Sequence, residues 1–184
     1  VLDKLEPTLA KLREKNISIN LLGEKEKSEQ LKSDMQRAVL LALVLIFLTL
    51  LLIFSKMKYA LMVMSVIPFS VLGALLGHKL VGINLSMTSI IGILGLAGVV
   101  INDGIIMLDF IHGTNKVDEF LRRAKLRLRP ILLTSITTFL GLVTLMFYAT
   151  GQSVMFQPIA ISLGFGLLWG TVLNLFYLPM LYAV

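Results

Sequence analysis

The 184-residue chain contains no cysteine, which excludes disulfides, thiol nucleophiles and metal sites built on cysteine. Its two histidines, His78 and His112, are far apart and have no second ligand at metal-binding spacing. Neither a Ser/His/Asp arrangement nor a hydrolytic pair of carboxylates is visible, and the glycines lie in apolar stretches without the Gly-Lys-Ser/Thr of a phosphate loop. The sequence therefore predicts no enzyme, no metal site and no bound cofactor.

Long apolar runs are present instead. Hydrophobic residues make up 57% of the chain, more than in ordinary soluble domains. Each run is long enough to cross a bilayer as a helix. The predicted spans are 38–55, 59–80, 86–111, 130–149 and 158–184. We therefore expect residues 38–184 to form an all-α polytopic membrane bundle with five transmembrane helices.

Residues 1–37 have a different character, with eight Lys/Arg against seven Asp/Glu. Leucines at helical spacing near the start predict an amphipathic helix. Residues 17–21 alternate as a half-buried strand does, and 24–37 predict a second charged helix leading into the membrane. These elements are too few to build a core. We expect them to be the tail of an α/β domain, and the chain to be a piece of a longer protein without a visible signal peptide.

The formal net charge of +6 does not point to nucleic acid, because basic and aromatic residues are not interleaved as in a strand-binding surface. The turn at 56–58 and the loop 112–129 together hold eight Lys/Arg, whereas Lys79 alone lies beside the opposite loops. The positive-inside rule places the basic loops in the cytoplasm and the N-terminal segment in the periplasm. We expect the basic run 122–129 to contact anionic membrane lipid.

Asp103 lies deep inside an apolar span, where an ionised carboxylate costs roughly 2.5–3.5 kcal/mol. It lies about 12 Å from the cytoplasmic end of its helix, at the depth expected for Thr138 on the next span. Thr134 shares the face of Thr138, and Asn174 is a further candidate partner. We predict a buried proton relay. The alternative is that Asp103 only joins two helices by a hydrogen bond, an interaction of roughly 0.6–2 kcal/mol.

Small residues recur within the spans at spacings that allow helices to approach closely. Two Gly-x-x-x-Gly pairs lie in the second and last spans, and three glycines lie in the Asp103 span. The predicted packing glycines are Gly73, Gly77, Gly92, Gly95, Gly98, Gly166 and Gly170.

Two motifs together carry a family resemblance. Gly-Leu-Ala-Gly-Val-Val-Ile-Asn-Asp-Gly-Ile-Ile-Met-Leu-Asp-Phe (95–110) is followed by Arg-Leu-Arg-Pro-Ile-Leu-Leu-Thr-Ser (127–135). With Gly-Glu at 23–24, Ile-Pro at 67–68 and Gln-Pro at 157–158, the chain resembles the inner-membrane pumps of the resistance–nodulation–division (RND) superfamily over essentially its whole length. The branch is the acriflavine-resistance, multidrug-efflux type.

The resemblance implies the C-terminal part of a protein with two tandem halves, beginning in a periplasmic porter domain. It also implies a homotrimeric drug/proton antiporter of the bacterial inner membrane, powered by the proton gradient and coupled to a periplasmic adaptor and an outer-membrane channel. The main acidic pair would lie in the missing N-terminal half. The matching positions here are Asn102, Asp103 and Thr134, with Arg127 at a functionally important arginine. Asn102 stands at the position where the family often has a lysine, so this half of the site lacks that cation. The next residue, Asp103, adds a carboxylate instead.

Two other functions stay open at this stage. A protein-export or assembly factor of the same superfamily would share these spans but use them for secretion. A non-transporting remnant of a truncated gene would only associate with another half. An intramembrane enzyme lacks any nucleophile–base pair.

Overall fold

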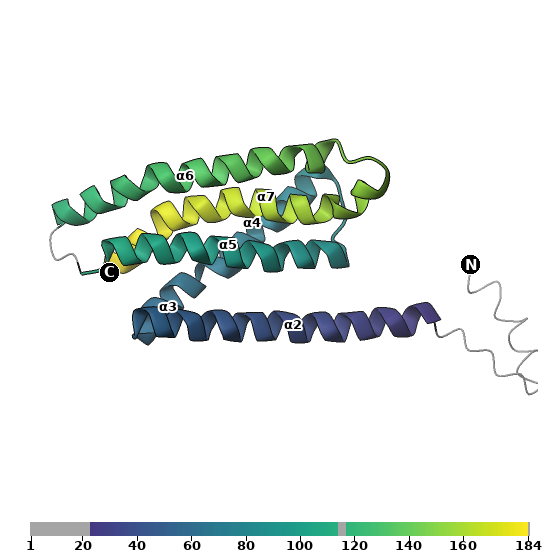
Figure 1. Cartoon of the computed structure of the whole chain (residues 1–184), viewed down its shortest axis with the longest axis horizontal. Coiled ribbons are helices and arrows are strands. Elements are labelled where there is room, and N and C mark those ends of the chain that lie inside the picture. The colour runs from purple at the N-terminus through teal and green to yellow at the C-terminus, as the bar shows by residue number, and fades with distance from the viewer. Residues whose placement is uncertain (1–22, 114–116, 184) are drawn as a thin grey trace, which may run out of the picture. The chain divides into compact units, whose positions relative to one another are not determined.

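The computed structural model describes residues 23–113 and 117–183 (Figure 1). The predicted strand at 17–21 and the amphipathic helix before it lie outside these residues. The chain divides into two units, residues 1–41 and 42–184. In the part that the structure describes, the chain is helical and has no strand.

The helices follow the predicted apolar runs closely. The elements are α2 (Gly23–Phe54), α3 (Met57–Met64), α4 (Val66–Val81), α5 (Met87–Ile111), α6 (Val117–Phe147), the 3₁₀ helix η1 (Gly151–Phe156), α7 (Gln157–Val172), the π-helical turn η2 (Leu173–Tyr177) and α8 (Leu178–Ala183). Five stretches are long and apolar enough to cross a membrane, with α3 and α4 forming one and η1 to α8 another. The expected all-α bundle of five spans is therefore confirmed.

Local sequence signals explain several helix ends. Gly82 ends α4 with φ of 78°, in the left-handed region that glycine adopts readily. Ser86 begins α5 as a capping residue, since its hydroxyl accepts the Ser89 amide at 3.3 Å and the Ser89 hydroxyl accepts the Ser86 amide at 3.0 Å. Pro158 lies in the first turn of α7, where its missing N–H leaves no helical bond unmade.

Two prolines act inside a span. Pro68 has no N–H to offer the Met64 carbonyl, and the second span is interrupted there, at Ser65 between α3 and α4. Pro130 was expected to begin the fourth span, and this is wrong: it lies inside α6, which already begins at Val117. The amphipathic stretch before Pro130 continues the helix because its apolar side packs on the bundle, with Phe120 and Ala124 against the core.

Helix α7 lies at the centre of unit 42–184 and packs against α4, α5 and α6 (Figure 1). Glycines make these approaches possible. A Cβ built on Gly73 would collide with the Trp169 side chain, and one on Gly77 with Phe165. No larger residue fits at either position without moving α4 away from α7.

The α5–α7 contact uses glycines from both helices. A Cβ on Gly92 would lie 2.8 Å from the Ile159 carbonyl oxygen, and one on Gly170 would lie 2.6 Å from a Val100 methyl. A Cβ on Gly166 would collide with Leu96. Residues 92, 96 and 100 are four apart, so one row along α5 faces α7.

Gly95 and Gly98 do not belong to this row. A Cβ on Gly95 would make an ordinary 3.5 Å contact with Leu163, and one on Gly98 would meet nothing within 4 Å in the described part of the chain. The expectation of close packing is corrected for Gly98, because it points away from α7. Two further glycines pack closely although their spacing did not indicate it. A Cβ on Gly164 would collide with Met146 on α6, and one on Gly104 would lie 3.1 Å from a Val63 methyl.

His78 connects α4 to α7 at the end of the bundle near the α4–α5 turn. It is buried, its Nδ1 lies 3.1 Å from the Ile83 carbonyl oxygen, and its Nε2 lies 2.9 Å from the Ser162 hydroxyl. A carbonyl only accepts, so Nδ1 carries the proton, and in the neutral ring Nε2 accepts from Ser162. His78 is thus a buried structural histidine with both nitrogens bonded.

We expect His78→Leu to lower the thermal stability of the purified full-length protein by about 1–3 kcal/mol, because the Ile83 carbonyl and the Ser162 hydroxyl lose their partner. Ser162→Ala removes one of the two bonds and should have a smaller effect. Thermal unfolding followed by size-exclusion chromatography measures both. Equal melting temperatures for His78→Leu and the unmodified protein would show that these bonds contribute nothing.

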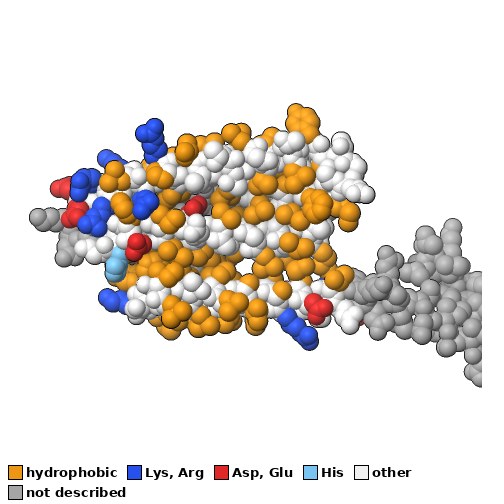
Figure 2. Space-filling view, in the orientation of Figure 1, with side chains coloured by type: hydrophobic (Ala, Val, Ile, Leu, Met, Phe, Trp, Pro, Cys, Tyr) orange, Lys and Arg blue, Asp and Glu red, His pale blue; other side chains and the backbone are white. Residues whose placement is uncertain are grey.

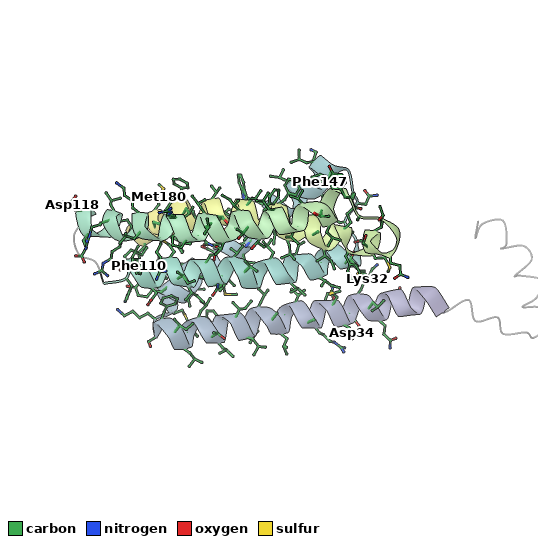
Figure 3. All side chains as sticks on the ribbon, turned by 45° about the horizontal axis from the view of Figure 1, so that its top comes forward. Lys32, Asp34, Phe110, Asp118, Phe147 and Met180 are labelled. Atoms are coloured by element: carbon green, nitrogen blue, oxygen red, sulfur yellow. The ribbon has the colours of Figure 1, made fainter. Side chains whose placement is uncertain are left out.

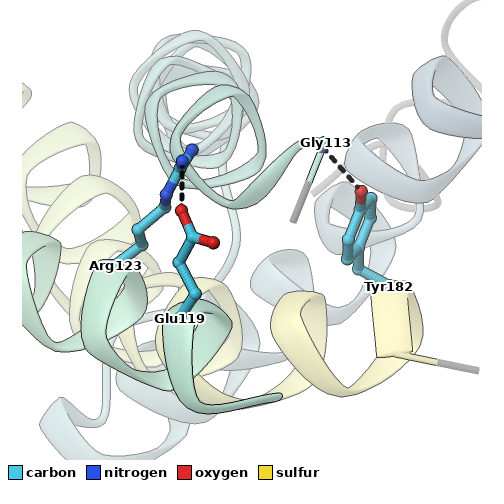
Figure 4. A network of polar contacts seen from close by, with 4 residues as sticks. All are labelled: Gly113, Glu119, Arg123 and Tyr182. Atoms are coloured by element: carbon cyan, nitrogen blue, oxygen red, sulfur yellow. Dashed lines mark hydrogen bonds and ion pairs between the residues drawn. The ribbon is translucent and has the colours of Figure 1, made fainter. Parts of the chain in front are cut away.

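Hydrophobic side chains cover much of the outer surface of the bundle, as lipid contact requires (Figure 2). Lys and Arg side chains gather at the end where α6 begins, which we call the basic end. At this end Glu119 and Arg123 form an ion pair of 2.6 Å, and the Tyr182 hydroxyl accepts the Gly113 amide at 3.2 Å (Figure 4).

Candidate functional site: a cavity between α5 and α6

One face of α5 carries the predicted relay residues. Val99, Asn102, Asp103 and Ile106 follow the spacing of one helical face. Their side chains line a cavity of about 210 Å³ between α5 and α6. Asp103 is seven residues from Leu96, so the cavity lies beside the row of α5 that packs against α7, toward α6.

The facing side of α6 completes the cavity. The lining residues from this helix, which also share one helical face, are Arg127, Pro130, Ile131, Thr134, Ser135 and Thr138. Leu167 on α7 also lines the cavity. The structure therefore brings all five predicted relay residues, Asn102, Asp103, Thr134, Thr138 and Arg127, to one cavity, while their proposed role in proton transfer stays a prediction.

The carboxylate of Asp103 is the chemically exceptional group in this cavity. The residue is only 8% exposed. Within the described residues it forms no ion pair, and no hydrogen bond reaches its carboxylate. A buried carboxylate without a partner is costly if charged. Asp103 therefore needs a proton, a cation, water or a group from outside this chain.

Arg127 lines the same cavity but does not pair with Asp103 in the described structure. Its guanidinium carbon lies 4.2 Å from the centre of the Phe110 ring, a cation–π contact between α6 and the end of α5. Figure 3 labels Phe110 at that end of α5. The Arg127 Nε is buried without a hydrogen-bond partner. The guanidinium is thus held against Phe110 in the lining of the cavity that contains the carboxylate, and its Nε–H has no hydrogen-bond partner.

The two threonines offer acceptors to the cavity. The Thr134 hydroxyl donates to the Ile131 carbonyl at 2.9 Å, and the Thr138 hydroxyl donates to the Thr134 carbonyl at 2.8 Å. With its hydrogen used in this way, each hydroxyl oxygen still has lone pairs. A protonated carboxyl group needs such an acceptor.

A buried hydroxyl pair lies directly behind the cavity and was not expected. The Thr171 hydroxyl on α7 donates to Ser135 Oγ at 2.6 Å, and Ser135 donates to the Ile131 carbonyl at 2.9 Å. Ser135 was visible in the sequence as a neighbour of the threonine face. Thr171 had no such signal, because only the rotation of α7 turns it toward α6.

Asn174 does not reach the cavity, so its expected partnership with Asp103 is corrected. It is fully buried, and its amide nitrogen donates to the Val100 carbonyl at 2.8 Å. Its Oδ1 would lie 3.2 Å from a Cβ on Gly104. Val100 and Gly104 are four residues apart on α5 and do not line the cavity, so Asn174 contacts a different face of α5 from the one that carries the cavity.

The cavity combines one partnerless carboxylate, one guanidinium and several hydroxyl oxygens inside an apolar bundle. In the part of the chain that the structure describes, there is no cluster of three or more His, Cys, Asp or Glu side chains that would hold a metal ion. The set is suited to binding and releasing a proton or another small cation.

Comparison with known proteins places this geometry in a family. Residues 8–184 match the model of the AcrB/AcrD/AcrF family. The chain is 36% identical over 168 residues to the cobalt-zinc-cadmium resistance protein CzcA of Cupriavidus metallidurans, covering 88% of this chain and 16% of that protein. It is 29% identical over 160 residues to the multidrug resistance protein MdtC of Erwinia amylovora, covering 84% of this chain and 16% of that protein.

A solved structure shows the same fold. The chain superposes on the crystal structure of a heavy metal efflux pump (crystal form II) with a TM-score of 0.81 and 26% identity, over 97% of this chain and 19% of the pump chain. The chain thus spans about a sixth of the length of these curated relatives.

Proposed function

The chain belongs to the AcrB/AcrD/AcrF family of the RND superfamily, and from this membership we propose that it supplies half of the transmembrane proton-coupling domain of an inner-membrane efflux transporter. The remaining length of the relatives leaves room for the other half and for the periplasmic domains that the sequence predicts. Family membership makes a transporter, rather than an enzyme, the function to test.

The observation that carries the proposal is the buried, partnerless Asp103 facing the cavity between α5 and α6. When protonated, its carboxyl group would donate to the oxygen of Thr134 or Thr138. When ionised, it would attract the guanidinium of Arg127. Each proton that crosses a membrane potential releases roughly 2.3 kcal/mol per 100 mV, enough to shift a conformational equilibrium substantially.

The exchange between these two states is how proton binding would move helices. The protonated carboxyl group would bond the threonine hydroxyls of α6, and the ionised one would attract Arg127. The interaction between α5 and α6 would therefore differ between the two states. The packing along the α5–α7 row is close, whereas the cavity side has free volume, so movement is easier on the cavity side. We propose that α6 shifts against α5 when Asp103 changes its protonation state.

The cargo we propose is a drug or similar amphiphile, exchanged for protons. The similarity to CzcA favours a second candidate, divalent heavy-metal ions, and the similarity to MdtC favours the first. Cargo contacts in such pumps would lie in the porter domains that precede these spans. The partners we propose are the N-terminal half, two further copies in a homotrimer, a periplasmic adaptor and an outer-membrane channel.

The proposed orientation places the basic end in the cytoplasm and the N-terminal segment in the periplasm. Its support is the distribution of Lys and Arg, which gather where α3 and α6 begin (Figure 2).

The test uses the full-length protein reconstituted in proteoliposomes with an imposed proton gradient. We expect acriflavine transport that depends on the gradient and stops when a protonophore collapses it, accompanied by proton flux in the opposite direction. Substituting Co²⁺, Zn²⁺ or Cd²⁺ for acriflavine tests the metal alternative in the same vesicles. Flux of either cargo that persists without the gradient contradicts proton coupling, and no gradient-dependent flux of any cargo favours an export factor or a non-transporting remnant.

A further inference from the structure

A second cavity lies nearer the start of α6, at the basic end. It measures about 320 Å³ and is bounded by the C-terminal part of α5, the first turns of α6, and η2 with α8. Its lining is apolar except for one residue and includes Met107, Phe120, Ala124, Phe176 and Met180. The exception is Lys125. We call this cavity the Lys125 groove.

The depth of the groove can be read from the length of α6. The helix runs from Val117 to Phe147, about 46 Å at 1.5 Å per residue, whereas the hydrocarbon core is about 30 Å thick. With Phe147 taken as the far boundary of the hydrocarbon core, Lys125 lies about 33 Å along the helix, so we expect its ammonium group at headgroup depth. Figure 3 shows Asp118 and Phe147 at opposite ends of α6, with Met180 toward the Asp118 end.

Basic side chains surround the mouth of the groove. Arg122 and Arg129 are exposed and lie three and four residues from Lys125, on the same face of α6. In the described residues none of the three forms an ion pair, whereas the nearby Arg123 is engaged by Glu119 (Figure 4). Three unpaired cations around the mouth of an apolar slot are complementary to a lipid with an anionic head and an acyl tail.

We propose that the Lys125 groove is a specific site for an anionic phospholipid of the surrounding leaflet. One acyl chain lies between α5, α6 and α8, and the phosphate is bound by Lys125 with Arg122 and Arg129 beside it. An acyl chain needs no hydrogen bond, and the groove offers almost none. An extended peptide would leave its backbone groups without partners there.

The site has a consequence for the cavity that contains Asp103. The groove and that cavity lie along the same helix, α6, with Leu128 in one lining and Arg127 in the other. A bound lipid therefore packs against the helix that we propose to move. The lipid site is nevertheless independent of proton coupling, because it depends on the groove and its charges alone.

The test uses the full-length protein in nanodiscs of phosphatidylcholine doped with photoreactive phosphatidylglycerol, with crosslinked peptides identified by mass spectrometry. We expect crosslinks to the stretch 120–128 and to η2 and α8. Lys125→Ser should reduce them about fivefold, the effect of one basic residue at an anionic membrane surface. Ala124→Trp, which fills the groove, should abolish them.

Lys58→Ser is the matched control, because Lys58 is exposed at the basic end but does not line the groove. It should leave the crosslinks unchanged. Equal labelling by photoreactive phosphatidylcholine would overturn the anionic specificity. If another segment of the protein fills the groove, the lipid crosslinks will be absent and a protein–protein crosslink will form at Lys125. That result would overturn the lipid as occupant.

Discussion

We expect the Asp103→Asn variant of the full-length protein to lose proton-driven transport completely while it folds and inserts normally. Asn has almost the shape of Asp, but its amide neither binds nor releases a proton. Transport in proteoliposomes should fall to the level of protein-free vesicles. The amount of monodisperse protein after purification reports folding, and it should not fall.

The same variant distinguishes the relay from the alternative in which Asp103 only joins two helices. If Asp103 served to join α5 to α6, its replacement would lower the melting temperature. In the described residues no hydrogen bond joins its carboxylate to α6, and removing a potential buried charge relieves an insertion cost. We therefore expect the melting temperature to stay the same or rise.

Asp109→Asn is the matched control for this experiment. Asp109 lies on the same helix, is exposed and does not line the cavity. This variant should transport normally, which would show that the loss belongs to the cavity and not to any carboxylate of α5. Normal transport by Asp103→Asn would refute the proposed relay.

The second large effect concerns helix packing. We expect Gly92→Ala to destabilise the full-length protein, although alanine is the better helix former by about 1 kcal/mol. The new methyl group would lie 2.8 Å from both the Ile159 carbonyl oxygen and the Ser162 Cβ, and 3.0 Å from the Ile159 Cα. Because two of these atoms belong to the backbone, α7 itself has to move. Overpacking of this kind costs typically about 1–3 kcal/mol.

Gly95→Ala, one turn further along α5, controls for the change in helix propensity. Its methyl group would meet only Leu163 methyl groups, at 3.5 Å and 4.0 Å, so this variant should be as stable as the unmodified protein or more so. Thermal unfolding of both variants in nanodiscs makes the comparison. Equal destabilisation of the two would show that position on the α7 contact row does not matter.

Much of the candidate site was predictable because it depends on spacing within single helices. Asn102 and Asp103 lie next to each other in one apolar run, and Thr134 and Thr138 lie four residues apart in another. Helical periodicity then determines that each set shares a face, and equal depth from the connecting loop brings the sets together. The apolar runs also determined the five spans, because a backbone in lipid must satisfy its hydrogen bonds within its own helix.

The family was likewise predictable, and its membership is confirmed. The Asp103 motif and the arginine-rich start of the next helix together are specific for this family. Neither motif alone identifies it. The α/β domain tail expected at residues 1–37 stays a prediction.

What the sequence did not determine is how each helix is rotated about its axis and where it crosses its neighbours. Those rotations turn Asn174 toward Val100 rather than Asp103, and they bring Thr171 to Ser135. They leave Gly98 off the α7 contact row. Such contacts join residues up to 74 positions apart, so no local spacing records them.

The sequence by itself thus determined the spans, the depth of the carboxylate and the faces that meet around it, since these follow from helix periodicity and from the polarity of lipid. The tertiary structure alone decided that Asp103 has no partner within the described chain and that an apolar groove with Lys125 in its lining lies nearer the start of α6. Both depend on how side chains from several helices fill space together, and that is a property of the packed bundle.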